Sequence, residues 1–223
     1  MITSIKSFIL HFDQRRRFFR SLHNAHRILD VGCGTGKNAL EIRQLHPASE
    51  YHGVDLLQDA HVPSFIQYRQ VDLEQGSLPY PDGHFDAVLV IHLLEHLLKP
   101  LALGSEIERV LKKDGRVYVE TPNWISLFLP SLRVNRAQVG SINFFDDHTH
   151  VKPWSKHGLH EFLEGTCRLR VENVGTVRNW LRMPIDPFVL LFGLLTSNRG
   201  VVASAIWNLT GWRIFGVGRK HGN

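Results

Sequence analysis

A ten-residue stretch near position 30 narrows the choice of fold sharply. Residues 27–36 begin as a short apolar strand, continue with an aspartate and end in a turn in which every second residue is glycine. Glycine is favoured where the backbone takes a positive φ or where a ligand must touch the main chain. Leu40, Ile42 and Leu45 then form the apolar side of a helix. A strand, a glycine turn and a helix in this order predict the pocket-forming unit of an α/β protein.

Strand-like runs recur along the chain. They lie at Arg27–Val31, Glu50–Val54, Phe65–Val71, Phe85–Ile91, Arg116–Glu120, Arg168–Val177 and Trp212–Val217. The first five alternate with turns or helices such as Lys37–Leu45 and Ala102–Leu111. This alternation predicts an α/β fold with a seven-stranded, mostly parallel sheet and helices on both of its faces.

The length of 223 residues suits a single domain with a sizeable core. We expect this domain, 1–223, to have four parts. They are an N-terminal amphipathic helix (1–26), a ligand-binding core (27–120), a lid or substrate segment with short helices of its own (121–160), and the final strands with an apolar helical insertion (161–223).

The composition is basic, with a formal charge of +5 and a pI near 9.4. Clustered arginines suit solvated helix faces, and an anionic substrate or a membrane surface is the alternative. No aromatic-interleaved nucleic-acid motif accompanies them, so we expect no nucleic-acid partner. Cys33 and Cys167 cannot form a disulfide framework, which favours a reducing, cytoplasmic compartment and leaves membrane association open.

The run Phe188–Leu195 is apolar on every side. Such a helix must be buried in the protein or an oligomer contact, or lie in a membrane interface. It is too short to span a bilayer, which needs about 20 apolar residues. Both placements stay open from the sequence.

The glycine turn does not match the dinucleotide fingerprint. It reads Gly-Cys-Gly-Thr-Gly, so Lys37 stands where a GxGxxG motif needs its third glycine. Asp30 before the turn would repel a pyrophosphate but can attract an ammonium group. A nicotinamide-dependent oxidoreductase is therefore disfavoured.

Five short motifs follow one another in the first half of the chain. They are Ile28–Gly36, Tyr51–Leu56, Asp72-Leu73, Leu78–Asp86 and Val90–Leu97. In this order they resemble the motifs of class I S-adenosylmethionine-dependent methyltransferases, in the small-molecule branch of the ubiquinone-biosynthesis or type 11 kind. The resemblance implies a Rossmann-like fold and methyl transfer to oxygen or carbon of a small or lipid-linked acceptor. A non-catalytic scaffold with this fold at a membrane surface remains the alternative.

The resemblance assigns the glycine turn to the cofactor S-adenosylmethionine. Gly32, Cys33, Gly34 and Gly36 would let the backbone approach its methionyl part, and the helix that follows would face its carboxylate. Asp30 would lie near the ammonium and sulfonium side. Cys33 is expected to act as a small residue in a tight turn.

Residues after the next strands complete the expected cofactor site. Asp55, followed by Leu56, would accept hydrogen bonds from the ribose hydroxyls. Asp72 would accept from the adenine amine, with Leu73 against the ring face. His92, at the end of the fourth strand, is expected to line the same site, although a loop histidine bonded to the nearby backbone is an equal alternative.

Two histidine-containing segments bear on catalysis. His92, Glu95 and His96 match an HxxEH zinc-protease pattern, but they sit at a strand-to-helix turn, so we expect neither a protease nor a metal. His148 or His150 could act as general base because histidine titrates near neutrality. A structural role for both is the alternative, and neither the acceptor nor the oligomeric state follows from the sequence.

Overall fold

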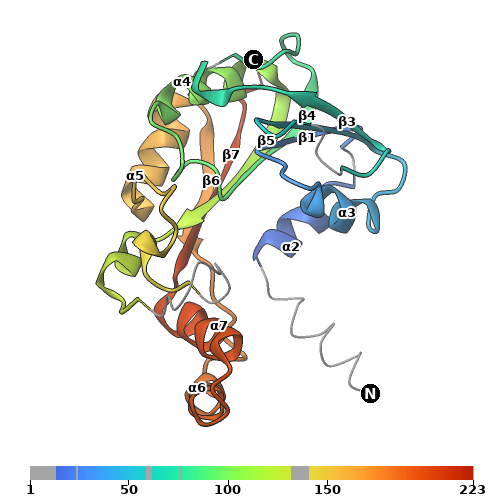
Figure 1. The fold of residues 1–223 in the computed structure, drawn as a ribbon. Coiled ribbons are helices and arrows are strands. Elements are labelled where there is room, and N and C mark those ends of the chain that lie inside the picture. Colours follow the sequence, from blue (N-terminus) through green and yellow to red (C-terminus); the bar gives the residue numbers. More distant parts are fainter. Residues whose placement is uncertain (1–13, 24, 59–61, 76, 132–140, 223) are drawn as a thin grey trace.

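The computed structural model describes residues 14–23, 25–58, 62–75, 77–131 and 141–222, which form a mixed sheet flanked by helices (Figure 1). The strands are β1 (Arg27–Val31), β2 (Glu50–Asp55), β3 (Ile66–Gln70), β4 (Phe85–Ile91), β5 (Leu111–Pro122), β6 (Arg170–Thr176) and β7 (Arg213–Arg219). The helices and helical turns are α2 (Gln14–Arg20), α3 (Lys37–Arg43), η1 (Leu73–Gln75), α4 (Pro100–Val110), η2 (Trp124–Phe128), η3 (Phe144–Asp146), α5 (Lys156–Glu161), η4 (Phe162–Thr166), α6 (Asp186–Leu195) and α7 (Arg199–Thr210).

The sheet has seven strands in the order β3-β2-β1-β4-β5-β7-β6. The first five pair in parallel, and β7 is antiparallel to both β5 and β6. The predicted α/β architecture and all seven strands are confirmed. β5 is longer than predicted because it begins at Leu111, which pairs with Phe85 ahead of an irregularity in the ladder.

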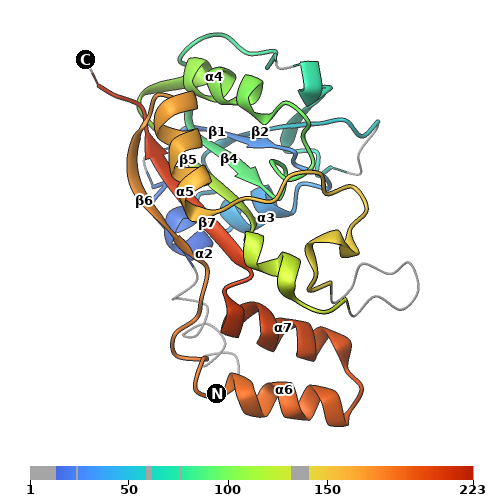
Figure 2. The same ribbon diagram turned by 90° about the vertical axis from the view of Figure 1, so that its left-hand side faces the viewer.

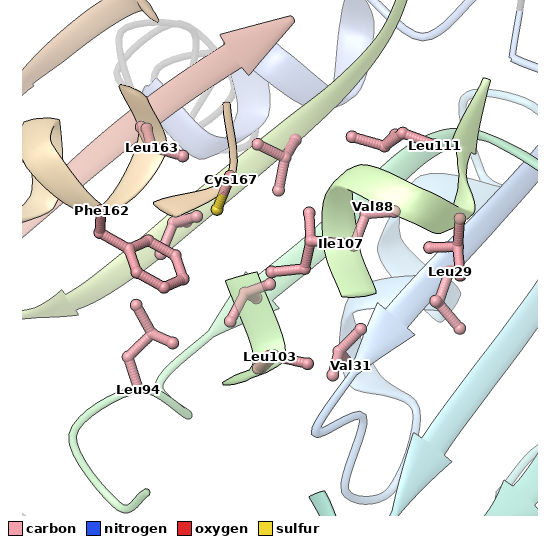
Figure 3. Close-up of a cluster of buried hydrophobic side chains, with 14 of the residues drawn as sticks. Leu29, Val31, Val88, Leu94, Leu103, Ile107, Leu111, Phe162, Leu163 and Cys167 are labelled. Carbon is pink, nitrogen blue, oxygen red and sulfur yellow. The ribbon is translucent and has the colours of Figure 1, made fainter. Parts of the chain in front are cut away.

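Side-chain alternation divides the core between the two faces of the sheet. Ile28 of β1 packs on one face with Phe18 of α2 and Ile42 of α3. Leu29, the next residue, packs on the other face with Ile107 of α4 (Figure 3). Successive strand residues point to opposite faces, so a strand such as β1, in which Ile28 and Leu29 are both buried, needs helices on both faces. The sheet is therefore covered on both sides, as the sequence predicts.

Of residues 1–26, where an amphipathic helix is predicted, the structure describes residues 14–23 and 25–26. α2 buries Phe18 and Phe19 against the sheet. The predicted apolar positions Ile5, Phe8, Ile9 and Phe12 lie outside the described residues.

The described part of the segment between β5 and α5 contains two short helical turns, η2 and η3. η2 and η3 are each capped by an asparagine, Asn123 and Asn143, whose side chains accept from the backbone. Ser155 caps α5 by accepting from the Gly158 amide at 3.0 Å, which confirms the predicted N-cap.

The apolar insertion is a helical hairpin, α6–α7, between β6 and β7 (Figure 2). In both ribbon views α7 lies nearer the sheet and α6 lies outermost. Only Asp186 and Gly193 of α6 are buried, so the helix that holds Phe188–Leu195 is not part of the core of the described structure. No helix among the described residues is long and apolar enough to cross a bilayer.

Candidate active site

Four parallel strands bring the predicted site segments to one edge of the sheet. The carboxyl ends of β1, β2, β4 and β5 lie side by side at this edge, and the loops that follow them hold most of the polar residues described below. Ligands of open α/β sheets bind outside the carboxyl ends of the strands. β7 runs the other way, so its first residue, Arg213, also falls at this edge, opposite Pro122.

The glycine turn after β1 has the conformation that its sequence predicts. Gly32, Gly34 and Gly36 have φ values of 74°, 50° and 76°, in the left-handed region. A Cβ placed on Gly34 would meet nothing within 4 Å among the described residues. The Gly34 amide donates to Asp55 Oδ2 at 2.8 Å, which ties the turn to the end of β2. Backbone at Gly34 is thus open to a ligand.

Asp30 is a buried acid that accepts a hydrogen bond from an uncharged side chain. Its side chain is 2 % exposed and accepts from Asn38 Nδ2 at 3.2 Å. Burial raises the pKa of Asp30 to about 7, and the hydrogen bond from Asn38 offsets this only in part. A cationic ligand group placed beside it would favour the carboxylate form.

The other expected cofactor residues lie at the ends of β2 and β3. Asp55 also accepts from the Leu57 amide at 3.2 Å, while Leu56 is 64 % exposed. Asp72 is exposed and accepts from the Glu74 amide at 3.0 Å at the start of η1.

Leu73 and Cys33, two further residues of the expected cofactor site, are buried like Asp30. The Leu73 side chain packs in the core, so the backbone of Leu73 is better placed than its side chain to contact an adenine ring. Cys33 is buried, and burial, with Asp30 and Asp55 nearby, raises the pKa of its thiol to about 12. An inert Cys33 agrees with its expected role as a small turn residue.

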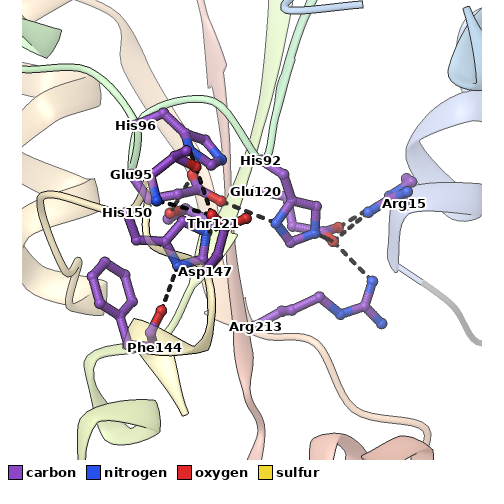
Figure 4. A network of polar contacts seen from close by, with 11 residues as sticks. Arg15, His92, Glu95, His96, Glu120, Thr121, Phe144, Asp147, His150 and Arg213 are labelled. Carbon is purple, nitrogen blue, oxygen red and sulfur yellow. Dashed lines mark hydrogen bonds and ion pairs between the residues drawn. The ribbon is translucent and has the colours of Figure 1, made fainter. Parts of the chain in front are cut away.

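A buried acid, Glu120, organises the polar side of the site (Figure 4). It lies near the end of β5 and accepts from Arg15 Nε at 3.2 Å, from Arg213 at 2.8 Å and from Tyr118 Oη at 2.7 Å. Burial alone would raise the pKa of Glu120, but Arg213 and Arg15 hold it well below its ordinary value. Glu120 is therefore a carboxylate that joins α2, β5 and β7.

His92 links Glu120 to a second buried acid. Its Nε2 lies 3.4 Å from Glu120 Oε1 and its Nδ1 lies 3.1 Å from Glu95 Oε1. Burial lowers the pKa of His92, but hydrogen bonds with Glu120 and Glu95 outweigh it and raise the pKa above the ordinary value. The residue also has a φ of 53°, which is uncommon for residues other than glycine. His92 is held through carboxylates, not through the nearby backbone.

Glu95 connects this network to the segment that contains His150. Its Oε2 accepts from Thr121 Oγ1 at 2.9 Å, and its carbonyl accepts from the Val151 amide at 2.8 Å. One ligand atom from each of Glu95, His96 and His150 lies within 4.8 Å of the others, a grouping that could hold a metal ion. The expectation that no metal binds stays a prediction.

Of the two histidines expected to act as a base, His150 lies in this network and His148 is exposed to solvent. His150 Nδ1 lies 2.7 Å from the Phe144 carbonyl, which can only accept, so Nδ1 carries the proton and Nε2 keeps a lone pair. Burial lowers the pKa of His150, so the ring is neutral near pH 7. Nε2 makes no hydrogen bond with the described residues and lies 3.9 Å from Asp147 Oδ2. A neutral ring with its lone pair on Nε2 has the form that a general base needs.

Several residues of the network were not foreseen from the sequence. They are Arg15, Glu120, Thr121 and Arg213. Glu120 could have been noticed as a lone acid in an apolar strand. The Arg15–Glu120 pair joins residues that are 105 positions apart, and no local sequence pattern predicts such a contact.

A comparison of the sequence with known families settles its membership. The profile of the methyltransferase domain family matches residues 8–166. The chain belongs to this methyltransferase family. Its strand order, with β7 antiparallel, is that of the class I S-adenosylmethionine-dependent members, so the fold and family predicted from the five motifs are confirmed.

Curated relatives of this methyltransferase domain match part of their length. The uncharacterised methyltransferase YcgJ of Bacillus subtilis is 31% identical over 135 residues, which cover 57% of this chain and 51% of that protein. The ubiquinone/menaquinone biosynthesis C-methyltransferase UbiE of Citrifermentans bemidjiense is 29% identical over 128 residues, 49% of this chain and 53% of UbiE. The matched part thus spans about half the length of these relatives.

A solved structure shows the same fold over most of the domain. The geranyl diphosphate C-methyltransferase of Streptomyces coelicolor, a complex with Mg²⁺, geranyl diphosphate and S-adenosyl-L-homocysteine, superimposes with a TM-score of 0.59 at 17% identity. The match covers 87% of this chain and 70% of the other.

The residues present fit the methyl donor that is typical of the family, S-adenosylmethionine. The donor carries an ammonium and a sulfonium cation and a ribose diol. Among the described residues, the buried Asp30 accepts its hydrogen bond from the neutral Asn38 amide, and burial raises its pKa although Arg15 offsets this in part. The backbone at Gly34 is open. Asp55 keeps carboxylate lone pairs beyond the two amides that it binds.

Proposed function

We propose that this protein transfers a methyl group from S-adenosylmethionine to an oxygen or carbon atom of a small or lipid-linked acceptor. One observation carries the proposal: the open glycine turn with its buried acid shares a sheet edge with the network of His92, Glu95 and His150. The first group suits a cationic cofactor, and the second suits an acceptor that must be oriented and deprotonated.

The cofactor is assigned to residues of the first three strands and the loops after them. Asp30 would pair with the ammonium group, and the turn Gly32–Gly36 with Cys33 would hold the methionyl part. Asp55 would accept from the ribose, with Leu56 beside it. Asp72 and the backbone of Leu73 would meet the adenine. His92 would line the side nearer the acceptor.

The bound cofactor supplies an activated methyl group on sulfonium sulfur, so the protein needs mainly to position and desolvate the reactants. His150 would accept the proton of the acceptor at Nε2, because Nδ1 is fixed by the Phe144 carbonyl. His92 does not suit this step, since both of its ring nitrogens face carboxylates and its raised pKa favours the imidazolium. His92 would instead hold Glu95 and Glu120 in place.

Calorimetry with S-adenosylmethionine, S-adenosylhomocysteine and NAD tests the cofactor assignment. We expect the first two to bind, NAD not to bind, and Asp55→Ala to weaken binding of both. Release of S-adenosylhomocysteine in the presence of a cell extract then separates an enzyme from a scaffold that only binds the cofactor. Equal affinity of Asp55→Ala and the parent for S-adenosylmethionine would defeat the assignment.

A pair of substitutions tests the base. His150→Ala should abolish turnover and leave the affinity for S-adenosylmethionine unchanged, whereas His148→Ala should leave both unchanged. Because the pKa of His150 is lowered, parental turnover should fall only when the pH drops below the ordinary range of histidine. Unchanged turnover in His150→Ala would remove the residue from the mechanism.

A further inference from the structure

α6, the outer helix of the α6–α7 hairpin, presents an apolar surface in the described part of the structure. Six of its residues or immediate neighbours are each at least 54 % exposed: Ile185, Phe188, Leu191, Phe192, Leu194 and Leu195. At about 100° per residue, these positions cover roughly half of the helix circumference. A continuous exposed apolar face of this kind marks a site of interaction with another body.

The opposite side of α6 is fixed tightly to α7. A Cβ on Gly193 would lie 2.9 Å from Val202 Cγ2 and 3.0 Å from the Val202 backbone nitrogen, so the two helices pack closely there. Asp186, the one acid of the hairpin, is buried, bonded to Arg182 at 2.6 Å and to the Asn208 amide. The apolar face is therefore presented by a rigid pair of helices and does not arise from a frayed end.

The charges of the hairpin are complementary to an anionic surface. Residues 177–212 contain three arginines, Arg178, Arg182 and Arg199, and one acid, Asp186. Because Asp186 is buried and paired, the hairpin exposes no negative side chain. Trp180, 67 % exposed, lies before α6 with the Arg178 guanidinium 5.9 Å from its ring. Tryptophan and arginine at the border of an apolar face are typical of helices that lie in a lipid interface.

The face itself favours acyl chains over a protein partner. Between Asp186 and Thr196 the sequence carries no polar side chain. Protein interfaces normally include about one hydrogen bond per 100–200 Å², and this face offers no side chain to make one. A lipid boundary makes no such demand, because a helix satisfies its own backbone groups.

We propose that the α6–α7 hairpin docks the protein on an anionic phospholipid bilayer, with the exposed face of α6 at the headgroup–acyl boundary. The base of the hairpin adjoins the site: Asn123 after β5 donates to the Gly211 carbonyl at 3.0 Å, and Arg213, two residues on, binds Glu120. Docking would thus bring the acceptor edge to the membrane. The inference deepens the proposed function, and rests on it for the link to a lipid-linked acceptor.

Vesicle flotation with matched variants tests this docking. The hairpin variant is Leu191→Asp with Leu195→Asp, at residues that are 54 % and 77 % exposed. The control is Leu101→Asp with Leu98→Asp, at residues that are 54 % and 75 % exposed near the start of α4. All four side chains are exposed, so neither pair should unfold the protein.

We expect the parent and the α4 control to float with phosphatidylcholine–phosphatidylglycerol vesicles, less with pure phosphatidylcholine and less at high salt. The hairpin variant should lose at least about tenfold in bound fraction and keep the parental affinity for S-adenosylmethionine.

Three results would overturn the docking: no flotation of the parent, equal flotation of the hairpin variant, or a parent dimer that the hairpin variant converts to monomer without a change in flotation. If the parent floats with vesicles but does not bind S-adenosylmethionine, the proposed function is refuted and the docking is not.

Discussion

Asp30 gives the clearest case in which stability and function oppose each other. The change Asp30→Asn keeps the shape of the side chain and its contact with Asn38, but removes the charge. In the folded protein burial raises the pKa from 3.8 to about 7. At about 1.4 kcal/mol per pKa unit, the ionised form of this residue costs on the order of 4 kcal/mol in the ligand-free protein above pH 7.

The sign of the pH dependence follows from the raised value. Between about pH 4 and 7 the folded state holds a proton that the unfolded state has lost, so the stability of the parent falls as pH rises through this range and levels off above it. Asp30→Asn should therefore raise the free energy of unfolding by about 2–4 kcal/mol near pH 8 and by about 1 kcal/mol near pH 4.5.

Urea denaturation of both proteins at the two pH values measures this difference. The reasoning is refuted if Asp30→Asn lowers stability near pH 8, or if its effect does not change with pH. The same variant should bind S-adenosylmethionine about tenfold more weakly, since one charge-assisted hydrogen bond is lost. The affinity of the parent should rise between about pH 5.5 and 7 as Asp30 ionises, and that of the variant should stay flat.

Three further changes have distinct expected outcomes. Glu120→Gln should lower the free energy of unfolding by about 3 kcal/mol, because the arginines that it pairs lose their charged partner; urea denaturation checks this, and a change within error would contradict it. Gly34→Ala should lower the free energy of unfolding by about 1 kcal/mol because its backbone is left-handed, and it should weaken S-adenosylmethionine binding in calorimetry. Gly83→Ala is the control, since its φ is also positive and an added Cβ also meets nothing within 4 Å among the described residues. It should cost the same stability and leave binding intact. His52 is 5 % exposed, its ring nitrogens have no hydrogen-bond partner among the described residues, and burial lowers its pKa. Protonation of His52 therefore favours the unfolded state, and stability falls below about pH 6.5. His52→Phe should shrink the drop in Tm between pH 7.5 and 5.5, and an equal drop would tell against this account.

The fold could be read from the sequence because its signals are local. Ten consecutive residues define a strand such as β1 and the glycine turn after it. Ser155 marks the start of a helix because its side chain accepts a hydrogen bond from the first turn. The order of such units restricts the topology to a few choices, since parallel strands need crossovers of one hand. Even so, the start of β5 was missed, because Leu111 reads as the end of the preceding helix.

The site could be read only where one segment makes it. The glycine turn and the acids after β1 and β2 follow from the motif, whereas the Arg15–Glu120–Arg213 group is assembled from three distant elements. His148 and His150 stand on an irregular segment, so no periodicity indicates which one faces inward. The composition of an apolar helix predicts that its surface will be buried against something, but it does not predict that α6 lies outside the core.

The two ends of the α6–α7 insertion leave and re-enter the sheet as neighbours. The Val177 amide donates to the Arg213 carbonyl at 2.9 Å, and Thr176 pairs with Ile214. A graft that exchanges everything between these paired residues leaves the ladder of β6 and β7 closed and the cofactor strands untouched. Exchange of this one insertion could thus give relatives of this chain a different acceptor or a different location in the cell, while the residues that bind the methyl donor stay unchanged.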